Sequence, residues 1–319
     1  MNNATAKSAI KAITDTCTGI KIFFVDSNNN LFDSDVQNTV LDDFRNDFVE
    51  NLRAKYSENE NFTCPKLSLA DDRGNALYYF DFEDGVKPLE FSFLDTVNAL
   101  PANQNLAKYQ VRSQGLSNLR GIVIRLKNQQ GQVMSFFQHL HNLSLVTPGK
   151  GAFLTTHQTR VVKLEHDVLR LGHKFVMAKV GDAYLIENVN ALEKELGFDK
   201  VIHSKAAQYC TVLQDKSLVN DLKKFKERLE NETTFARKFV KIFKGSAVIE
   251  QSLTNQNIIE FAMSKPFYRE KLKLTDSGDQ FDLNSQQRCA TFLRLLDDEF
   301  LKSELTGQDY IAKAKDRAS

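Results

Sequence analysis

Apolar residues follow two different rhythms along the chain, and each rhythm predicts one kind of element. In the C-terminal part they recur every three or four positions, which indicates helices at residues 189–196, 204–214, 217–230, 233–243, 256–264 and 285–302. In the middle they alternate with polar residues, which indicates strands at residues 120–127, 132–138, 160–166, 174–179 and 183–187. The first hundred residues mix both patterns, with helices at 8–14 and 35–56 and strands at 19–26, 67–70 and 76–82. The predicted fold class is α+β, with an N-terminal acidic α/β lobe, a mostly antiparallel sheet in the middle and a helical C-terminal region.

The helix predicted at residues 285–302 has one strongly apolar face. The members of that face, which we expect to be buried, are Phe292, Leu295, Leu296 and Phe300. The residues that fall mostly on the opposite face, and are expected to contact solvent, are Asp297, Asp298 and Glu299. Gly307 follows, and a glycine after a helix commonly ends it in a left-handed conformation.

The net charge of +1 hides a separation of charge along the chain. Residues 1–100 hold 9 Lys and Arg against 17 Asp and Glu, residues 101–179 hold 11 against 2, and residues 180–319 hold 22 of each. The basic middle segment favours a polyanionic partner, although the acidic and basic segments could instead neutralise each other internally. The polar residues 101–105 coincide with the change of sign. The predicted domains are therefore the acidic lobe at 1–100 and a second domain at 106–319, sheet-rich over 106–187 and helical over 188–319.

Residues 222–245 form a second basic cluster, with eight Lys and Arg against three Glu. Each of the two helices predicted here has an apolar stripe, and we expect the cations to lie off it, spaced to neutralise phosphates without reading sequence. The expected DNA contacts in this cluster are Lys223, Lys224, Arg228, Arg237, Lys238, Lys241 and Lys244. Secondary contacts are expected at Arg120, Arg125, Lys127 and Lys150. The alternative is an ordinary solvated helix face.

The sequence contains no recognisable catalytic constellation. The four cysteines are far apart, so neither a disulfide framework nor a zinc site is indicated. His139 and His141 would point to the same side of an extended segment, but no surrounding motif completes a metal site. No predicted strand carries the Glu-x-Lys that a metal-dependent nuclease needs after its first acid, and the GKG at residues 149–151 lacks the rest of a P-loop. We therefore expect no metal, no cofactor and no catalytic residue.

The sequence also bears on location. No apolar run approaches 18 residues, as a membrane-spanning helix would require. The first residues lack the long apolar segment of a secretory signal, and widely separated cysteines suit a reducing compartment. We expect a cytoplasmic protein that does not insert into a membrane by itself.

The order of residues near the C-terminus resembles the closing signature of the KwaB family, the soluble component of the bacterial Kiwa anti-phage defence system. The residues that carry the resemblance are Leu295-Leu296-Asp297-Asp298, Phe300-Leu301, Ser303, Leu305-Thr306-Gly307, Tyr310 and Lys315. Residues 121–138 and 175–198 are similar to a strand pair and a strand-and-helix segment of the same family.

This resemblance implies an effector that binds double-stranded phage DNA largely without sequence specificity and hinders its replication or expression. It also implies a homodimer that is recruited to the inner membrane by a membrane protein, KwaA. Two other functions stay open at this point. The chain could be a metal-dependent nuclease of a defence system, or a non-catalytic assembly subunit whose basic surface binds protein.

Overall fold

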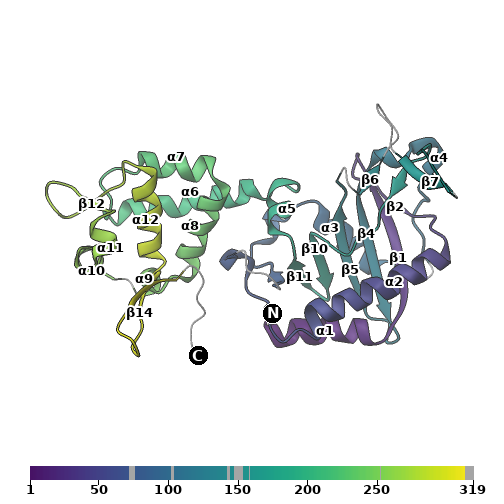
Figure 1. Cartoon of the computed structure of the whole chain (residues 1–319), viewed down its shortest axis with the longest axis horizontal. Coiled ribbons are helices and arrows are strands. Elements are labelled where there is room, and N and C mark those ends of the chain that lie inside the picture. The colour runs from purple at the N-terminus through teal and green to yellow at the C-terminus, as the bar shows by residue number, and fades with distance from the viewer. Residues whose placement is uncertain are drawn as a thin grey trace. The chain divides into compact units, whose positions relative to one another are not determined.

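Figure 1 shows the computed structural model, which describes residues 1–71, 76–101, 104–141, 144–146, 154–157, 159–251 and 253–312. The chain forms two compact units: unit 1 comprises Met1–Leu67 with Gly74–Leu196, and unit 2 comprises Ser68–Arg73 with Gly197–Ser319. This division differs from the predicted one near residues 100 to 106. The reason is that β1 (Cys17–Asp26) is hydrogen-bonded along its length to β4 (Leu119–Asn128). Most of the first hundred residues therefore belong to the same unit as the basic segment.

Unit 1 is built on a seven-stranded sheet with the order β2-β1-β4-β5-β10-β11-β3, and its neighbouring strands are antiparallel. The other strands are β2 (Leu31–Asp33), β3 (Tyr78–Tyr79), β5 (Val133–His139), β10 (Met177–Val180) and β11 (Ala183–Ile186). Gly131 has φ 80° in the turn between β4 and β5, a conformation that tight hairpins often require. The predicted antiparallel sheet is confirmed, and with the helices described below so is the α+β class.

Helices cover both faces of this sheet, which explains why its central strands are buried along most of their length. On one face α1 (Asn3–Asp15) and α2 (Asn38–Leu52) pack over a core that includes Ile122 and Phe48 (Figure 1). On the other face lies α3 (Glu90–Ala99), whose Phe93 ring is 6.2 Å from that of Phe137. Gly121 leaves room for Phe137, because a Cβ at this position would lie 2.7 Å from its ring.

The shorter elements of unit 1 connect these layers. They include the helices α4 (Val111–Gln114) and α5 (Val189–Lys194), a π-helical turn at Arg53–Ser57, and 3-10 turns at Asp84–Val86 and Leu116–Asn118. A strand was predicted at residues 67–70, but Leu67–Leu69 form a 3-10 turn, so that prediction is wrong.

Between β5 and β10 the chain leaves the main sheet and forms two nested two-stranded ladders. β6 (Leu145–Val146) pairs with β9 (Val168–Leu169), and β7 (Leu154–His157), which lies between them in the sequence, pairs with β8 (Arg160–Lys163). We refer to these four strands as the β arm. The strand predicted at residues 160–166 is therefore shorter, and it belongs to the arm instead of the main sheet.

Unit 2 is mainly helical, as predicted for the C-terminal region. Its helices are α6 (Asp199–Asp215), α7 (Lys223–Asn231), α8 (Thr233–Gly245), α9 (Ala247–Glu250), α10 (Asn255–Ser264), α11 (Pro266–Arg269) and α12 (Gln286–Leu296). Phenylalanine dominates its core, where ring centroids lie 5.1 to 6.2 Å apart among Phe225, Phe239, Phe281 and Phe292. Two short hairpins complete the unit, β12 (Lys273–Leu274) with β13 (Phe281–Asp282) and β14 (Phe300–Lys302) with β15 (Asp309–Ile311).

The helix predicted at residues 285–302 is shorter than expected, because α12 ends at Leu296. Asp298 adopts a left-handed conformation with φ 53°, which is uncommon for a residue other than glycine, and the chain leaves the helix there. Phe300 therefore lies on β14 and is only half-buried. The burial predicted for Phe292, Leu295 and Leu296 is confirmed.

Candidate nucleic-acid interface

The basic helices α7 and α8 are held together by an aromatic core. Phe225 of α7 lies between Phe235 and Phe239 of α8, at ring distances of 5.2 and 5.1 Å. The short connection at Glu232 lets α8 begin directly after α7 ends. The two helices therefore present their basic residues within one compact element, and the ion pairs of each cation decide whether it can meet a phosphate.

Two of the cations predicted on α7 are already paired with carboxylates. Arg228 donates from Nε to Glu232 at 2.9 Å, and its guanidinium lies 4.0 Å from the centre of the Phe235 ring. The hydrogen bond from Arg228 holds the pKa of Glu232 below its usual range. Lys224 pairs with Glu227 at 2.8 Å. The positive charge of both side chains is thus largely balanced within α7 and its C-terminal end.

Arg237 and Lys238 were expected on an exposed face of α8; that prediction is wrong for Arg237, and Lys238 is half-buried. Arg237 is buried, with 8% of its surface exposed. Lys238 forms an ion pair with Glu299, whose side chain is only 2% exposed. The helix is covered on this side by segments far away in the sequence, since Ala70, Asp71, Asp297 and Glu299 line the same pocket of about 220 Å³ as Arg237 and Lys238.

The same pocket corrects a second expectation. Asp297 and Glu299 were predicted on a solvated helix face, yet they are 7% and 1% exposed. Arg294 approaches the second oxygen of Glu299 at 3.6 Å, so Glu299 lies between two cations. These carboxylates are part of a buried charge cluster in unit 2. Their burial could not be read from helical periodicity because both follow the end of α12.

Three other predicted contacts of unit 2 are more accessible. Lys223 and Lys244 are exposed, and Lys241 is half-buried at the rim of the charged pocket. Within the described residues, neither Lys223 nor Lys241 forms an ion pair. The cationic surface of α7 and α8 is therefore smaller than the sequence indicates.

The four secondary candidates of unit 1 differ from one another. Arg120 pairs with Glu90 at 2.7 Å, and Arg125 is half-buried and donates to the Leu100 carbonyl at 3.1 Å. Burial lowers the pKa of Arg125 from its usual value. Lys127 is exposed and has no acidic partner among the described residues. Lys150 lies outside the described residues.

Part of the charge separation is neutralised inside unit 1, and part is not. Three cations of the basic segment pair with carboxylates from the first hundred residues: Lys108 with Asp35, Arg120 with Glu90, and Lys179 with Asp95. A larger group is exposed and, within the part of the chain that the structure describes, forms no ion pair. We refer to this group as the unpaired cations of unit 1; they are Arg112, Lys127, Arg160, Lys163, Arg170 and Lys174.

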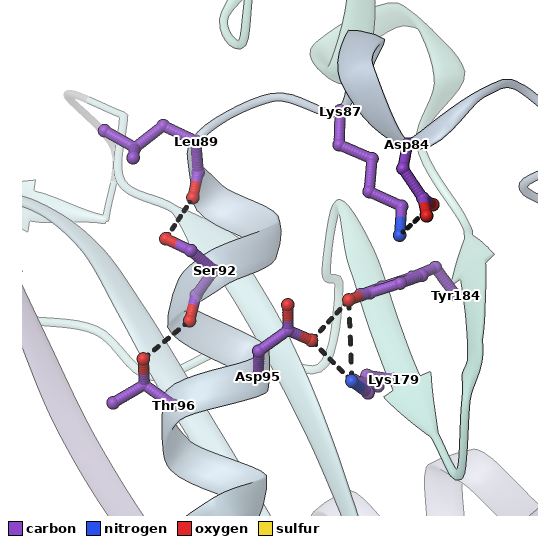
Figure 2. A network of polar contacts seen from close by, with 8 residues as sticks. All are labelled: Asp84, Lys87, Leu89, Ser92, Asp95, Thr96, Lys179 and Tyr184. Atoms are coloured by element: carbon purple, nitrogen blue, oxygen red, sulfur yellow. Dashed lines mark hydrogen bonds and ion pairs between the residues drawn. The ribbon is translucent and has the colours of Figure 1, made fainter.

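The pair between Lys179 and Asp95 belongs to the network drawn in Figure 2. Lys179 donates to Asp95 at 2.5 Å, and the Tyr184 hydroxyl donates to the same carboxylate oxygen. Burial alone would raise the pKa of Asp95, but these two hydrogen bonds outweigh it and hold the pKa below its usual range. Lys87 lies 4.6 Å above the Tyr184 ring and pairs with Asp84 at 2.8 Å. This network joins α3 to β10 and β11, so its cations stabilise the fold.

Histidines and cysteines form no further site in the described residues. His139 is 3.6 Å from Glu195, and its ring lies 5.6 Å from that of His141. No group of three or more His, Cys, Asp or Glu is arranged to hold a metal ion among the described residues. All four cysteines have free thiols, and Cys64, Cys210 and Cys289 are buried. In the same residues no helix is both long and apolar enough to cross a membrane.

Sequence reasoning missed five of the six unpaired cations of unit 1. The charge count indicates the segment, but of this group only Lys127 lies on the strand predicted at residues 120–127. The signal that could have found the others is the excess of 11 Lys and Arg over two acidic residues, Glu165 and Asp167, in residues 101–179.

Comparisons with known proteins match the whole chain to one family. A family model described as Kiwa protein KwaB-like matches residues 116–306. The Kiwa protein KwaB of Escherichia coli O55:H7 (strain RM12579 / EPEC) is 27% identical over 319 residues, which is 99% of each chain. No solved structure matches.

Proposed function

Since the chain belongs to the KwaB-like family of Kiwa proteins, we propose that it is an anti-phage defence protein that binds double-stranded DNA and hinders phage replication or expression. The observation that carries the proposal is the group of unpaired cations of unit 1. An exposed cation without a carboxylate partner can neutralise a DNA phosphate, and the counterion that the DNA then releases contributes to the binding free energy. Arg112, Lys127 and Lys174 illustrate the point, because each is exposed and none is balanced within the described residues.

Unit 2 is proposed to contribute a second set of contacts. The candidates are Lys223, Lys241 and Lys244 of the basic helices, of which Lys223 and Lys244 are exposed and Lys241 is half-buried. Contacts of this type go to phosphates, which carry no sequence information. We therefore expect similar affinity for duplexes of unrelated sequence.

Anisotropy titration of a labelled duplex at several salt concentrations tests the proposal. Each phosphate contact adds about 0.9 to the slope of log K against log salt concentration. Replacing Arg112, Lys127 and Lys174 by alanine should therefore reduce the slope by up to about 2.7. Replacing Lys223, Lys241 and Lys244 should reduce it by a similar amount if all three meet phosphates.

A matched control removes a cation whose charge is already balanced. The double variant Lys224→Ala with Glu227→Ala deletes an ion pair without changing the net charge, so slope and affinity should stay at the wild-type values. If the folded triple variants bind with the wild-type slope, these residues are not the interface. If the wild-type protein shows no salt-dependent binding, the proposal of DNA binding fails and the charge serves a protein contact. Shortening of the labelled duplex in the presence of Mg²⁺ would favour the nuclease alternative.

The family assignment extends the proposal to partners. We expect a homodimer that is recruited to the inner membrane by the membrane protein KwaA. Sedimentation of the purified chain measures the first expectation, and co-purification with detergent-solubilised KwaA measures the second. A monomer that KwaA does not retain would contradict both.

A further inference from the structure

The tip of the β arm is a two-stranded ribbon that packs against no other strand of the described residues. β7 and β8 are paired in the register Leu154 with Lys163, Thr155 with Val162, Thr156 with Val161 and His157 with Arg160. Residues opposite each other in an antiparallel pair point to the same face, and successive residues alternate. One face of the ribbon therefore carries Leu154, Thr156, Val161 and Lys163.

This face is open to solvent although half of it is apolar. Leu154 and Val161 are each 66% exposed, and Thr156 and Lys163 are also exposed. On the opposite face Thr155 and Arg160 are exposed as well. Val162 on the opposite face is half-buried, so the face of Leu154 and Val161 is the more open one. A two-stranded ribbon is marginally stable by itself in water, so its shape and its exposed apolar groups indicate a contact with another molecule.

The base of the arm, in contrast, is anchored. Leu169 of β9 and Leu171 just after it pack against the core cluster of unit 1, and Arg170 donates its backbone N–H to the Ser144 carbonyl at 2.7 Å. The ribbon thus extends from an anchored ladder.

The charge of the tip identifies the class of partner. Strands β7 and β8 contain two cations and no carboxylate, and neither Arg160 nor Lys163 forms an ion pair within the described residues. They belong to the unpaired cations of unit 1 on which the proposed function rests. An apolar protein partner would be met more favourably by an uncharged ribbon, whereas a phosphate backbone requires cations on both sides of whatever contacts the bases.

We propose that the tip of the β arm enters the major groove of duplex DNA, with Lys163 and Arg160 at phosphates and with Leu154 and Val161 against the base edges. This inference rests on the proposed DNA binding and identifies the element of the fold that contacts the DNA. The major groove is about 12 Å wide and admits a two-stranded ribbon, whereas the minor groove is about half as wide. Aliphatic side chains can contact the C5-methyl group of thymine there.

Two arm variants separate the charged contacts from the apolar ones. Arg160→Ala with Lys163→Ala should lower the salt slope by about 1.8, so raising salt fourfold should weaken the wild type about 12-fold more than the variant. Leu154→Ser with Val161→Ser should leave the salt slope unchanged. It should weaken binding about fivefold for every ~40 Å² of apolar surface that the wild type buries against DNA and the variant does not. The matched controls are Lys11→Ala on α1 and Val40→Ser on α2, both exposed and expected to bind as wild type.

A modified duplex tests the groove directly. Glucosylated 5-hydroxymethylcytosine places a bulky group in the major groove, because the C5 position of a pyrimidine faces that groove. The wild type should bind this duplex more weakly than the unmodified one, and the Leu154→Ser with Val161→Ser variant should show a smaller difference.

The outcomes distinguish failure of the arm inference from failure of the proposed DNA binding. If the wild type binds unmodified DNA with a steep salt slope but the arm variants match it, the arm inference is wrong and the proposed function stands. Equal binding of the wild type to both duplexes would also overturn placement in the major groove. If the wild type does not bind DNA at all, both proposals fail.

Discussion

The ion pair between Lys238 and Glu299 offers a sharp test of how unit 2 is packed. Glu299 is 2% exposed at its side chain, and Lys238 is its closest cation. Arg294 Nε lies 3.6 Å from Glu299 Oε2, which is too far for a normal hydrogen bond. That oxygen has no hydrogen-bond partner among the described residues. Replacing Lys238 by alanine would leave a buried carboxylate without its main partner.

The expected cost follows from the burial of the two side chains. Removing one member of a fully buried pair costs about 3–5 kcal/mol. Lys238 is 33% exposed, so water can partly replace its ammonium group, and we expect Lys238→Ala to lower the free energy of unfolding by about 2–3 kcal/mol. For a unit of this size that corresponds to a decrease in Tm of about 6–12 °C.

Thermal unfolding followed by circular dichroism at 222 nm measures this change. The chain has no tryptophan, and unit 2 holds more than half of the residues in α-helices. The double variant Lys238→Met with Glu299→Met is the informative control, because removing both charges should cost less than removing Lys238 alone. An unchanged Tm for Lys238→Ala would refute the buried ion pair. A double variant less stable than the single one would show that the carboxylate is satisfied by other groups.

Two further predictions concern the core and the network of Figure 2. Leu296→Ala should lower the free energy of unfolding by about 2–5 kcal/mol, since this side chain is fully buried, and an unchanged melting temperature would contradict its place in the core. The pKa of Asp95 is lowered in the folded state, so the stability that its ionised form contributes is present above its unfolded pKa of about 3.9 and is lost as the pH falls through the folded value. Asp95→Asn should therefore be less stable than the wild type at pH 7 and approach it in acid; a difference independent of pH between 3 and 7 in denaturant titrations would argue against the ionised network.

The periodicity of the sequence was a good guide where a single element has one buried face. The strands around Ile122 and Phe136, and the helices around Phe225 and Phe292, lie where the pattern predicts them. In each case the residues that decide the element are its own neighbours in sequence, so local pattern and tertiary packing agree.

The predictions failed where distant segments decide the environment. Arg237 lies opposite the Phe235 and Phe239 stripe of α8, and a helical projection places it in solvent. It is buried because residues 68–71 and 297–299 cover that side of the helix, and neither segment can be inferred from the periodicity of α8. The end of α12 failed for a related reason. Asp298 takes a left-handed conformation that the local pattern does not indicate, and the following residues then leave the helix.

The candidate interface shows why formal charge and available charge differ. Counting Lys and Arg located the basic segment, but the count cannot distinguish Arg120, which pairs with Glu90, from Lys127, which has no described partner. The pairing depends on β1 and α3 from the acidic first hundred residues, which surround the basic strands in unit 1. Part of the separated charge is therefore neutralised by ion pairs within unit 1, and the remainder stays exposed on its surface.

That remainder is unevenly distributed over unit 1, with a consequence for how DNA would approach. The exposed side of α2 carries Asp42, Asp43, Asp47 and Glu50, whereas the strands β7 and β8 at the tip of the β arm carry Arg160 and Lys163 and contain no carboxylate. A molecule with acidic and basic regions turns in the field of a polyanion, because the acidic region is repelled while the basic region is attracted. The acidic helix therefore disfavours contacts through its own face and favours encounters in which the arm meets the duplex first. Arm variants should accordingly slow association more than they speed dissociation at low salt, and this difference should disappear as salt screens the field.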